Sequence, residues 1–348
     1  MLENIIKGIK AIDKKLMETA QIRLDNLTKP KGSLGRLEEL AKHIVGITGK
    51  EYPTLKNKFI VTMAADHGVV KEGVSAFPQV VTKQMVLNFI NGGAAINVLA
   101  KHVGAKLVVV DMGVAANIPN SPHIINKKVR AGTKNFLIGP AMTRNEAIKS
   151  INAGIEVVME LVKQGCDIIG TGDMGIGNTT ASSAITAVLT DSPVDKVTGR
   201  GTGIDDTALL RKISIIKKAL LLNLPDKNDP LDVLSKVGGF EIGGIAGVIL
   251  GAAYNRVPIV IDGFISGAAS LIAVNLEPKV KEYLIASHCS FERGHKIILK
   301  YLGLTPLLDL SMRLGEGTGS ALGISLVDAS IKILNQMFTF KDANISEL

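Results

Sequence analysis

Tryptophan is absent from this 348-residue sequence, and aromatic residues make up only 4% of it. Since 46% of the residues are hydrophobic, the core must consist mainly of Ile, Val, Leu and Ala, which favours layers of buried strands and helices. Cysteine is almost absent too: Cys166 and Cys289 lie far apart, and neither belongs to a spacing typical of metal ligands. We therefore expect a protein of a reducing compartment, the cytoplasm.

Signals for secretion, membrane insertion and nucleic-acid binding are also missing. Residues 1–15 carry acidic side chains among the apolar ones, and the longest apolar stretches, around 243–254 and 257–274, are interrupted by Asn255, Arg256 and Asp262. The net charge of +8 is modest for this length, and the lysines are spread along the chain without an Arg-rich tract. We expect no membrane span and no nucleic-acid partner.

Apolar segments that predict strands alternate with segments of helical periodicity. Strands are expected at residues 59–65, 107–110, 168–169, 257–261 and 283–286. Helices are expected at 2–16, 36–45, 80–102, 145–163, 181–189, 210–221, 238–254 and from the last glycine loop to about 338, with a polar excursion at 116–140. This alternation predicts an α/β fold with a mostly parallel sheet flanked by helices.

Polar residues follow the ends of five predicted strands: Asp66, Asp111, Asp173, Asp262 and His288. Because parallel strands end at the same edge of a sheet, where open α/β folds bind ligands, these side chains should lie near one rim. Asp66 and His67 lack a spacing typical of metal ligands, so we expect them to make structural hydrogen bonds.

The segment 166–180 predicts an anion site. An apolar strand leads into a loop with glycines at positions 170, 172, 175 and 177, and Asn178 and Thr179 then offer N-caps for the next helix. Glycines let a backbone approach a ligand, and a helix N-terminus presents unpaired N–H groups, so phosphate is the expected anion. Asp173 would repel phosphate and is better suited to a sugar or a cationic ring.

A second glycine loop, Gly199 to Gly203, is compatible with a backbone anion site or with an ordinary surface turn. Asp205 or Asp206 is expected to cap the following helix. Lys212 lies one or two turns into that helix, where a lysine on its own is usually solvated.

Glu316 stands between Gly315 and Gly317, where no neighbouring side chain can shield it. A carboxylate in such a loop can reach into a cleft, acquire a raised pKa there and act as a general base. The same pattern is equally typical of an acid in a surface turn.

Two other classes of function remain open. Gly170, Gly172 and Gly175 spell a dinucleotide-binding G-x-G-x-x-G after a strand, although Asp191, at the spacing of a ribose ligand, lies in a predicted turn. An oxidoreductase and a non-catalytic nucleotide-binding protein are therefore the alternatives. A serine or cysteine hydrolase built on residues 287–290 is disfavoured because no G-x-S-x-G elbow is present.

Eight longer motifs are more specific than the residue spacings considered so far. They are KPKGSLGRLE (29–38), ADHGV (65–69), EGVSAFPQ (72–79), NGGAAI (91–96), MGIGNTT (174–180), GRGTG (199–203), VIDGFISGAA (260–269) and RLGEGTGS (313–320). In this order, and over nearly the whole chain, they resemble the nicotinate-nucleotide–dimethylbenzimidazole phosphoribosyltransferase family.

The resemblance implies a Rossmann-like large domain over residues 30–300 and a small helical domain formed by 1–29 and 301–348, in a homodimer. It implies transfer of phosphoribose from nicotinate mononucleotide to 5,6-dimethylbenzimidazole. The products would be nicotinate and α-ribazole 5′-phosphate, the precursor of the lower ligand of cobalamin. No cofactor and no metal is expected.

The resemblance also assigns residues. It implies catalytic roles for Glu316, as the base, and for Asp173. Substrate binding would fall on Gly175, Ile176, Gly177, Asn178, Gly201, Thr202, Gly203, Lys212, Ser75 and Ser290. The family usually has Glu where this chain has Asp173, so the shorter acid is a departure from the pattern.

Overall fold

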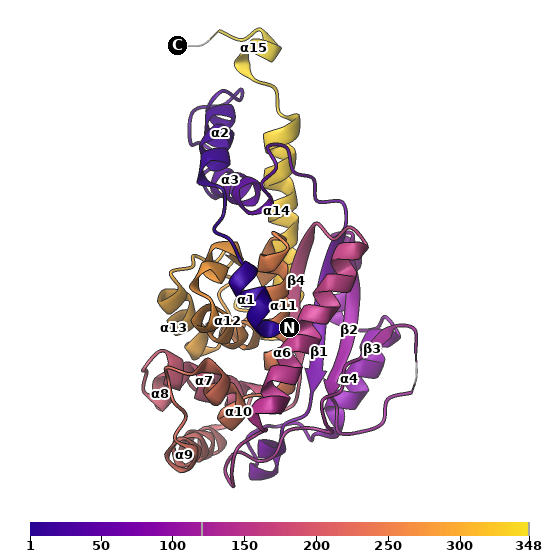
Figure 1. Cartoon of the computed structure of the whole chain (residues 1–348), viewed down its shortest axis with the longest axis vertical. Helices are drawn as coiled ribbons and strands as arrows, with labels where there is room; N and C mark the ends of the chain where they lie inside the picture. The colour runs from indigo at the N-terminus through magenta and orange to yellow at the C-terminus, as the bar shows by residue number, and fades with distance from the viewer. Residues whose placement is uncertain (120, 347–348) are drawn as a thin grey trace.

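The computed structural model describes residues 1–119 and 121–346. Its centre is a six-stranded sheet in the order β3-β2-β1-β4-β5-β6, in which every neighbouring pair is parallel (Figure 1). The strands are β1 (Lys58–Ala65), β2 (Ala105–Gly113), β3 (Ile124–Asn126), β4 (Ile168–Met174), β5 (Ile259–Ile261) and β6 (Leu284–Ala286). The predicted parallel α/β fold is confirmed, and β3 is an edge strand inside the predicted polar excursion.

Helices cover both faces of this sheet. They are α1 (Leu2–Gly8), α2 (Lys14–Asp25), α3 (Arg36–Thr48), η1 (Gly68–Glu72), α4 (Val80–Ile90), α5 (Ala95–His102), α6 (Arg144–Lys163), α7 (Asn178–Leu189), α8 (Val194–Val197), α9 (Asp206–Asn223), α10 (Pro230–Val237), α11 (Phe240–Tyr254), α12 (Phe264–Leu276), η2 (Pro278–Tyr283), α13 (Arg293–Leu302), α14 (Thr318–Gln336) and α15 (Phe340–Ala343). Among the described residues, none of these helices is both long and apolar enough to cross a membrane.

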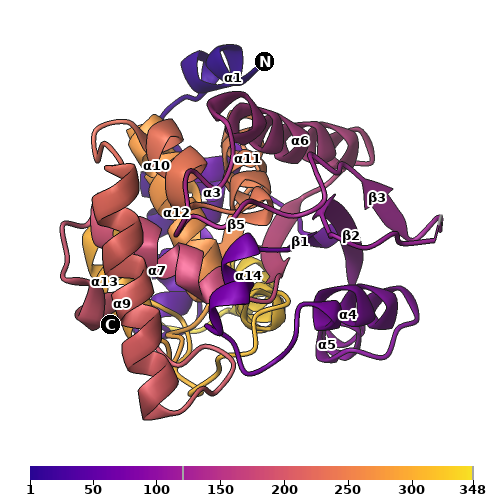
Figure 2. The same ribbon diagram turned by 90° about the horizontal axis from the view of Figure 1, so that it is seen from below.

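The side chains of β1 alternate between two hydrophobic layers. Phe59, Val61 and Met63 pack into the cluster that includes α6, α11 and α12, whereas Ile60 and Ala64 pack into the cluster that includes α3, α5 and α14. Figure 2 shows α6 and α11 on one side of the sheet and α4, α5 and α14 on the other. Burial on both faces explains why the strands are continuously apolar rather than alternating with polar residues.

Two helices predicted as single segments are each divided in the structure. The helix expected at 2–16 breaks between α1 and α2, where Asp13 caps α2 by accepting a hydrogen bond from the backbone N–H of Leu16 at 3.0 Å. The helix expected at 80–102 breaks between α4 and α5, where Gly92 has a left-handed φ of 79°. Hydrophobic periodicity continued across both breaks and hid them, because a local cap or glycine overrides the pattern.

The loop predicted to begin at Gly170 is wrong, because β4 continues to Met174. Gly170 and Gly172 lie inside the strand. Glycine is needed at both positions because the start of α14 packs directly on them. A Cβ at Gly172 would lie 2.3 Å from the carbonyl oxygen of Glu316, and one at Gly170 would lie 2.7 Å from the Ser320 hydroxyl. These glycines allow close packing of a second loop against the strand.

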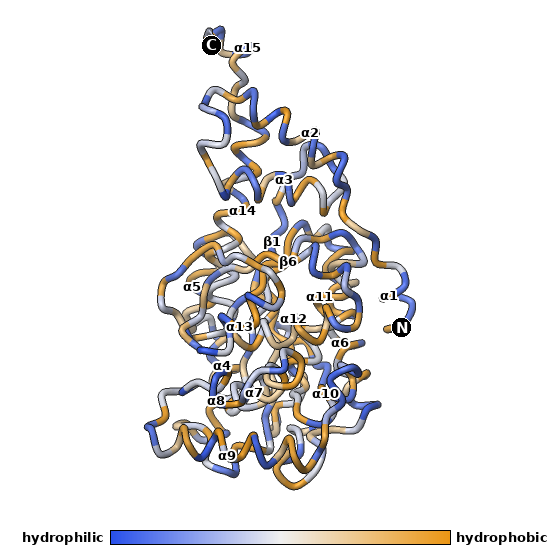
Figure 3. Tube along the Cα trace, turned by 90° about the vertical axis from the view of Figure 1, so that its left-hand side faces the viewer, coloured by the Kyte–Doolittle hydropathy of each residue, from blue (hydrophilic) through white to orange (hydrophobic). Residues whose placement is uncertain are grey.

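The two ends of the chain meet away from the sheet. Leu27 and Thr339 form an antiparallel bridge, and α2 and α3 pack against each other and against α14. Figures 1 and 3 show α2, α3, the end of α14 and α15 standing away from the body that holds the sheet. By contrast, Leu2 and Ile5 of α1 belong to the large hydrophobic cluster beside α11. The division of the chain at residues 30 and 300 stays a prediction.

Candidate active site

A cavity of about 430 Å³ opens at the carboxyl ends of β4 and β5. Its walls come from the loop after β4, the start of α12, the 199–203 loop, the loop before α14, and α4 with the segment that precedes it. Eight of the predicted site residues line it: Asp173, Gly175, Ile176, Asn178, Gly201, Thr202, Ser290 and Glu316. The structure thus brings together segments that are more than 140 positions apart in the sequence.

The first glycine loop, residues 175–177, connects β4 to α7 and places the N-terminus of α7 at the cavity. Gly177 is the N-cap residue, with a φ of 93°, and no side chain caps the helix. The expectation that Asn178 would cap α7 is therefore wrong; its side-chain amide instead donates to Asp173 Oδ2 at 2.8 Å. No side chain caps this N-terminus, although the N–H of Ile176 donates to Thr82 Oγ1 and the N–H groups of Asn178 and Thr180 donate to the carbonyl oxygens of Gly175 and Gly177. That the loop binds phosphate stays a prediction.

Asp173 is the last but one residue of β4, beneath the loop that carries Glu316, and it is buried. Burial raises the pKa of its carboxyl well above the usual value, and the negative charges of Asp262 and Glu241 raise it further, whereas the Asn178 hydrogen bond lowers it. These causes all act on the charged form of Asp173 in the low-dielectric interior. A cationic ring or a positively charged ribose nearby would shift this pKa downward and favour the carboxylate.

Glu316 adopts a left-handed conformation, with a φ of 65°, between Gly315 at 81° and Gly317 at 102°. Its side chain is 4% exposed, and Oε2 accepts a long hydrogen bond of 3.4 Å from the backbone N–H of Ile96. Burial raises the pKa of Glu316 to about 7; the Ile96 hydrogen bond opposes this shift, and the charge of Asp262 adds to it. Glu316 is thus not an acid in a surface turn, and a pKa near neutrality suits a general base.

The second glycine loop is already engaged by side chains. The N–H of Gly201 donates to Glu292 Oε1 at 2.9 Å, and Thr202 Oγ1 accepts from the N–H of Ala76 at 2.9 Å. Ser75 Oγ lies 3.2 Å from Thr202 Oγ1 and supports the loop from outside the cavity. Gly203 faces a neighbouring cavity of about 630 Å³ instead.

Lys212 is fully buried under this loop, so its expected solvation is wrong. Its Nζ donates to Thr179 Oγ1 at 2.8 Å and to the carbonyl oxygen of Gly199 at 3.3 Å. Burial lowers the pKa of the Lys212 ammonium to about 8, and the negative charge of Glu292 opposes this shift. Lys212 therefore joins the two glycine loops and places a cation directly behind both of them.

Known proteins match this chain over nearly its whole length. A family model described as Phosphoribosyltransferase matches residues 9–345. The chain is 59% identical to the nicotinate-nucleotide–dimethylbenzimidazole phosphoribosyltransferase of Roseiflexus sp. (strain RS-1) over 99% of this chain and 98% of that one. It is 56% identical to the enzyme of that name from Desulforudis audaxviator (strain MP104C), over 100% and 98%.

A crystal structure of CobT from Thermus thermophilus superimposes with a TM-score of 0.93 at 44% identity, covering 96% of this chain and 100% of that one. The chain belongs to the nicotinate-nucleotide–dimethylbenzimidazole phosphoribosyltransferase family. The resemblance of its motifs is thereby confirmed.

Asp191 and His67, which the alternative functions would use, lie outside the cavity. Asp191, the expected ribose ligand of a dinucleotide enzyme, lies in an exposed turn with a φ of 52° and pairs with Lys227. His67 Nε2 lies 2.6 Å from Glu241 Oε1, and both side chains are fully buried, in keeping with the structural hydrogen bonding expected of His67. Within residues 1–119 and 121–346, no cluster of three or more His, Cys, Asp or Glu side chains could hold a metal ion.

Of the five strand-end residues, Asp66 and Asp111 lie outside this cavity. Asp66 accepts a hydrogen bond from the N–H of Ala115 at 2.7 Å, and Asp111 accepts from the N–H groups of Gly113 and Val114. Asp111 thus caps the turn after its own strand, β2, and Asp66, which follows β1, caps the turn after the neighbouring strand β2. The predicted rim is correct for Asp173 and His288, which line the cavity, and for Asp262, which lies directly behind Glu316.

The cavity also has an apolar wall that was not predicted from the sequence. Phe77, Val81, Met85 and Leu314 line it, with Val81 and Met85 one turn apart on α4. Phe77 and Leu314 are 52% and 57% exposed, so they leave apolar surface at the mouth of the cavity. The four-residue spacing on α4 was visible in the sequence, but the same spacing marks any helix face that packs on a core.

Proposed function

We propose that this chain transfers phosphoribose from nicotinate mononucleotide to 5,6-dimethylbenzimidazole, releasing nicotinate and forming α-ribazole 5′-phosphate for the lower ligand of cobalamin. The observation that carries this proposal is the position of Glu316. Its carboxylate, with a pKa of about 7, shares one cavity with an uncapped helix N-terminus and an apolar wall. A base, an anion site and a surface for a flat apolar ring are the three features that the reaction requires.

The phosphate of the mononucleotide would bind at the N-terminus of α7, where Gly175, Ile176, Gly177 and Asn178 place the backbone close to the cavity. Lys212 supplies positive charge from behind the loop through Thr179. A buried glycine loop that lines the cavity, with a cation behind it, suits a phosphate that must be held while the sugar reacts.

The incoming benzimidazole would lie against Val81, Met85 and Leu314, opposite the phosphate loop. A nitrogen lone pair of this ring attacks C1′ of the ribose, while the bond between C1′ and the nicotinate nitrogen breaks and its electron pair neutralises the pyridinium. The leaving group therefore needs no acid. Attack from the face opposite the leaving group inverts the β-linkage of the substrate to the α-linkage of the product.

Two carboxyl groups would assist this displacement. Positive charge develops on the ribose as the bond breaks, and Asp173, once deprotonated, would stabilise it electrostatically. The benzimidazole carries an N–H proton that must leave after or during attack, and Glu316 would accept it. Because the two groups sit on different loops, one can face the sugar while the other faces the incoming base.

We also infer a cytoplasmic homodimer. Two buried free cysteines fit a reducing compartment. The homodimer is inferred from the resemblance of the motifs to the family. Light scattering after size-exclusion chromatography tests the dimer, since a monomeric mass at micromolar concentration would contradict it.

Chromatographic detection of nicotinate is the decisive experiment for the reaction. The purified chain should release nicotinate from the mononucleotide only when dimethylbenzimidazole is present, with equal formation of α-ribazole 5′-phosphate. A nucleotide sensor would bind the mononucleotide and release nothing, and an oxidoreductase would change the absorbance of a nicotinamide dinucleotide without regard to benzimidazole. Either result would overturn the proposal.

A further inference from the structure

We propose that Asp262 is the positioning residue for Glu316: its carboxylate holds the first turn of α14 and, through it, the left-handed loop that presents Glu316 to the cavity. This inference rests on the proposed function, in which Glu316 accepts the proton of the incoming base. Asp262 itself does not line the cavity, so it would act through Glu316 and not on the substrate.

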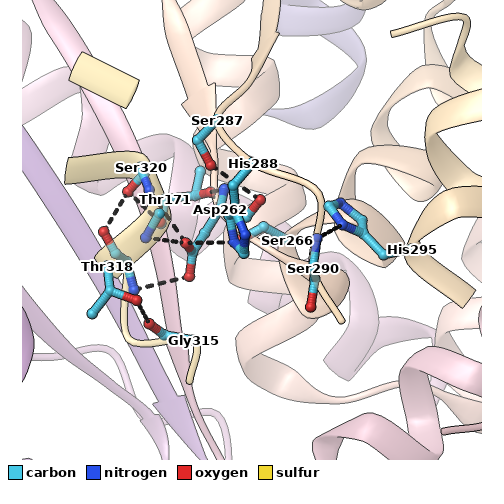
Figure 4. A network of polar contacts seen from close by, with 12 residues as sticks. Thr171, Asp262, Ser266, Ser287, His288, Ser290, His295, Gly315, Thr318 and Ser320 are labelled. Atoms are coloured by element: carbon cyan, nitrogen blue, oxygen red, sulfur yellow. Dashed lines mark hydrogen bonds and ion pairs between the residues drawn. The ribbon is translucent and has the colours of Figure 1, made fainter. Parts of the chain in front are cut away.

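The geometry is that of a helix cap supplied from a distant strand end. Asp262 Oδ2 accepts from the N–H of Gly317 at 3.0 Å, while Oδ1 accepts from the N–H groups of Gly319 at 2.8 Å and Ser320 at 3.2 Å (Figure 4). The N-cap residue of α14 is Gly317, which has no side chain to satisfy these groups. One fully buried carboxylate therefore takes up three of the N–H groups that a helix leaves unpaired.

Asp262 is itself held firmly. Its backbone N–H donates to Thr171 Oγ1 at 3.1 Å, and this hydroxyl donates to Ser266 Oγ at 2.8 Å. Ser320 Oγ lies 2.9 Å from the carbonyl oxygen of Thr171 and donates to it. These buried bonds join β4, β5, α12 and α14, so the carboxylate that receives the helix cannot move independently of the sheet (Figure 4).

The loop needs such an anchor because its backbone is strained. Residues 315, 316 and 317 all have positive φ values, of 81°, 65° and 102°, and the middle residue is not glycine. A left-handed Glu persists only where the surroundings hold it, and strain of this kind gathers at functional sites. Asp262 holds the C-terminal side of the loop, and Thr62 Oγ1 holds Glu316 itself by donating to its carbonyl oxygen at 2.7 Å.

The close packing at this point leaves no room for a looser arrangement. A Cβ at Gly319 would lie 2.1 Å from the His288 ring and 2.7 Å from Asp262 Oδ1. The backbone of α14 thus rests directly on these two side chains. His288 Nε2 lies 3.7 Å from Asp262 Oδ1 and closes the other side of the carboxylate.

Asp262 also influences Glu316 electrostatically. Burial is the main cause of the raised pKa of Glu316, and the negative charge of Asp262 raises it further. The other ionisable groups around the cavity are Asp173 on β4, His288 after β6, Glu292 before α13 and Arg313 in the same loop, while α5 contributes only the N–H of Ile96. Removing the charge of Asp262 should therefore lower the pKa of Glu316.

The test compares Asp262→Asn with Asp111→Asn. Asp111 is a buried acid at the end of β2 that also accepts two backbone N–H groups, at 3.0 and 2.8 Å, but it lies outside the cavity. At Asp262 the three N–H donors are shared between both carboxyl oxygens, so an amide turns its NH₂ group toward at least one donor and weakens the cap. At Asp111 both N–H groups are accepted by Oδ1, and Oδ2 pairs with Lys128 at 3.1 Å, so Asp111→Asn removes a buried charge and its ion pair while the amide oxygen can still accept both N–H groups. Only the Asp262 variant should disturb Glu316.

For Asp262→Asn we expect kcat to fall about 10- to 100-fold, since small displacements of a catalytic group have effects of this size. The KM for the mononucleotide should stay within about threefold, and the acidic limb of the pH–rate profile should move to lower pH. Hydrogen exchange of the peptide that covers residues 315–322 should accelerate. Asp111→Asn should change none of these quantities by more than about twofold.

Asp262→Ser, which keeps one acceptor oxygen, replaces the Asn variant if that protein does not fold, and the same loss of kcat and faster exchange are expected. Unchanged exchange together with kcat within twofold of the wild type would overturn the inference. So would a loss of kcat with the acidic limb in place, which marks a merely structural cap. If the wild type releases no nicotinate, the proposed function fails, while the exchange measurement still tests the anchoring of the loop.

Discussion

The backbone N–H of Glu316 donates a hydrogen bond to the backbone carbonyl oxygen of Asp173, with 3.2 Å between the two atoms. The two acids to which we assign chemistry are therefore joined directly, although they are 143 positions apart in the sequence. Gly315 lies over the Asp173 carboxyl so closely that a Cβ there would be 3.2 Å from both carboxyl oxygens. A substitution at either acid is therefore expected to alter the position of the other.

Glu316→Gln should reduce transfer to dimethylbenzimidazole by about 10²–10⁴-fold, the usual contribution of a positioned base. Glutamine keeps the size of the side chain and its hydrogen bonding but cannot accept the proton. The affinity for the mononucleotide should stay within a few fold, because the phosphate loop is on a different segment. Steady-state kinetics over the pH range and direct binding of the mononucleotide measure both quantities.

Glu316→Gly is the control for the shape of this loop. Glycine adopts a φ of 65° without strain, so this variant keeps the loop and removes only the carboxylate. It should be as inactive as the Gln variant. Near-normal turnover of either variant across the pH range would remove Glu316 as the base, and Asp66, Asp173 and Asp262 would be the acids to test next.

The same substitution to Gln should make the protein more stable at alkaline pH. The pKa of Glu316 is raised to about 7 in the folded chain from 4.5, so the folded state keeps a proton that the unfolded state loses first. Stability is then lost as the pH rises through this window, and the full cost is present above pH 7. Because solvent reaches the cavity, we expect a gain on the order of 1 kcal/mol for Glu316→Gln at pH 8 and none near pH 4.

Thermal unfolding of the wild type and the Gln variant at both pH values checks this prediction. The expected difference is a melting temperature about 1–3 °C higher for the variant at pH 8. Equal melting temperatures at pH 8 would mean that the Glu316 carboxylate is well solvated in the folded chain, and a pKa near neutrality would then have to be abandoned.

The sheet was predictable from sequence because each strand is an apolar run of β-formers that ends in a polar residue, and Phe59 to Asp66 is an example. The glycine loop that we assign to the phosphate does line the cavity, but its predicted extent was wrong. Gly170 and Gly172 looked like loop residues, but their lack of a side chain serves the packing of α14, and that contact spans about 150 positions. Local patterns carry no information on such a contact.

The burial of charged side chains was the other feature that could not be predicted from the sequence. Lys212 lies on a helix whose neighbouring lysines, Lys217 and Lys218, are exposed, and nothing in the spacing distinguishes it. Its burial follows from the two glycine loops that close over it. The occupation of the Gly201 N–H by Glu292 likewise depends on a segment 91 positions away.

Lys212→Met should raise the KM for the mononucleotide about three- to tenfold, because the Lys212 ammonium attracts the phosphate from behind the loop through Thr179. This attraction is weaker than a direct charged contact, which is worth about 1.5–3 kcal/mol. Methionine fills a similar volume but removes the ammonium that supports Thr179 and Gly199. Lys217→Met on the exposed face of the same helix is the matched control and should leave the KM unchanged. If the Lys212 variant binds the mononucleotide normally, its ammonium only holds the two loops together.

Asp173→Asn should lower kcat about 10²-fold while the affinity for the mononucleotide changes little. Asn keeps the size of the side chain and can still contact Asn178, and Asp173 is not among the residues to which we assign the phosphate. Binding should therefore tolerate the substitution. As positive charge develops on the ribose, only the acid can become a carboxylate and stabilise it, and a lost electrostatic partner of this kind costs about 10²–10³-fold.

Asp173→Glu decides between this chemical role and a structural one. It restores the residue usual in the family and keeps the charge, and substantial activity should remain because the longer side chain can still reach the sugar. If both variants lose activity and hydrogen exchange around Gly315 becomes faster, Asp173 only shapes the loop of Glu316. The reason would be that Gly315 lies against the Asp173 carboxyl and leaves little space for the longer side chain of Glu. Measuring kcat and the KM of each substrate for both variants distinguishes these outcomes. An Asp173→Asn variant with the kcat of the wild type would directly contradict the electrostatic role.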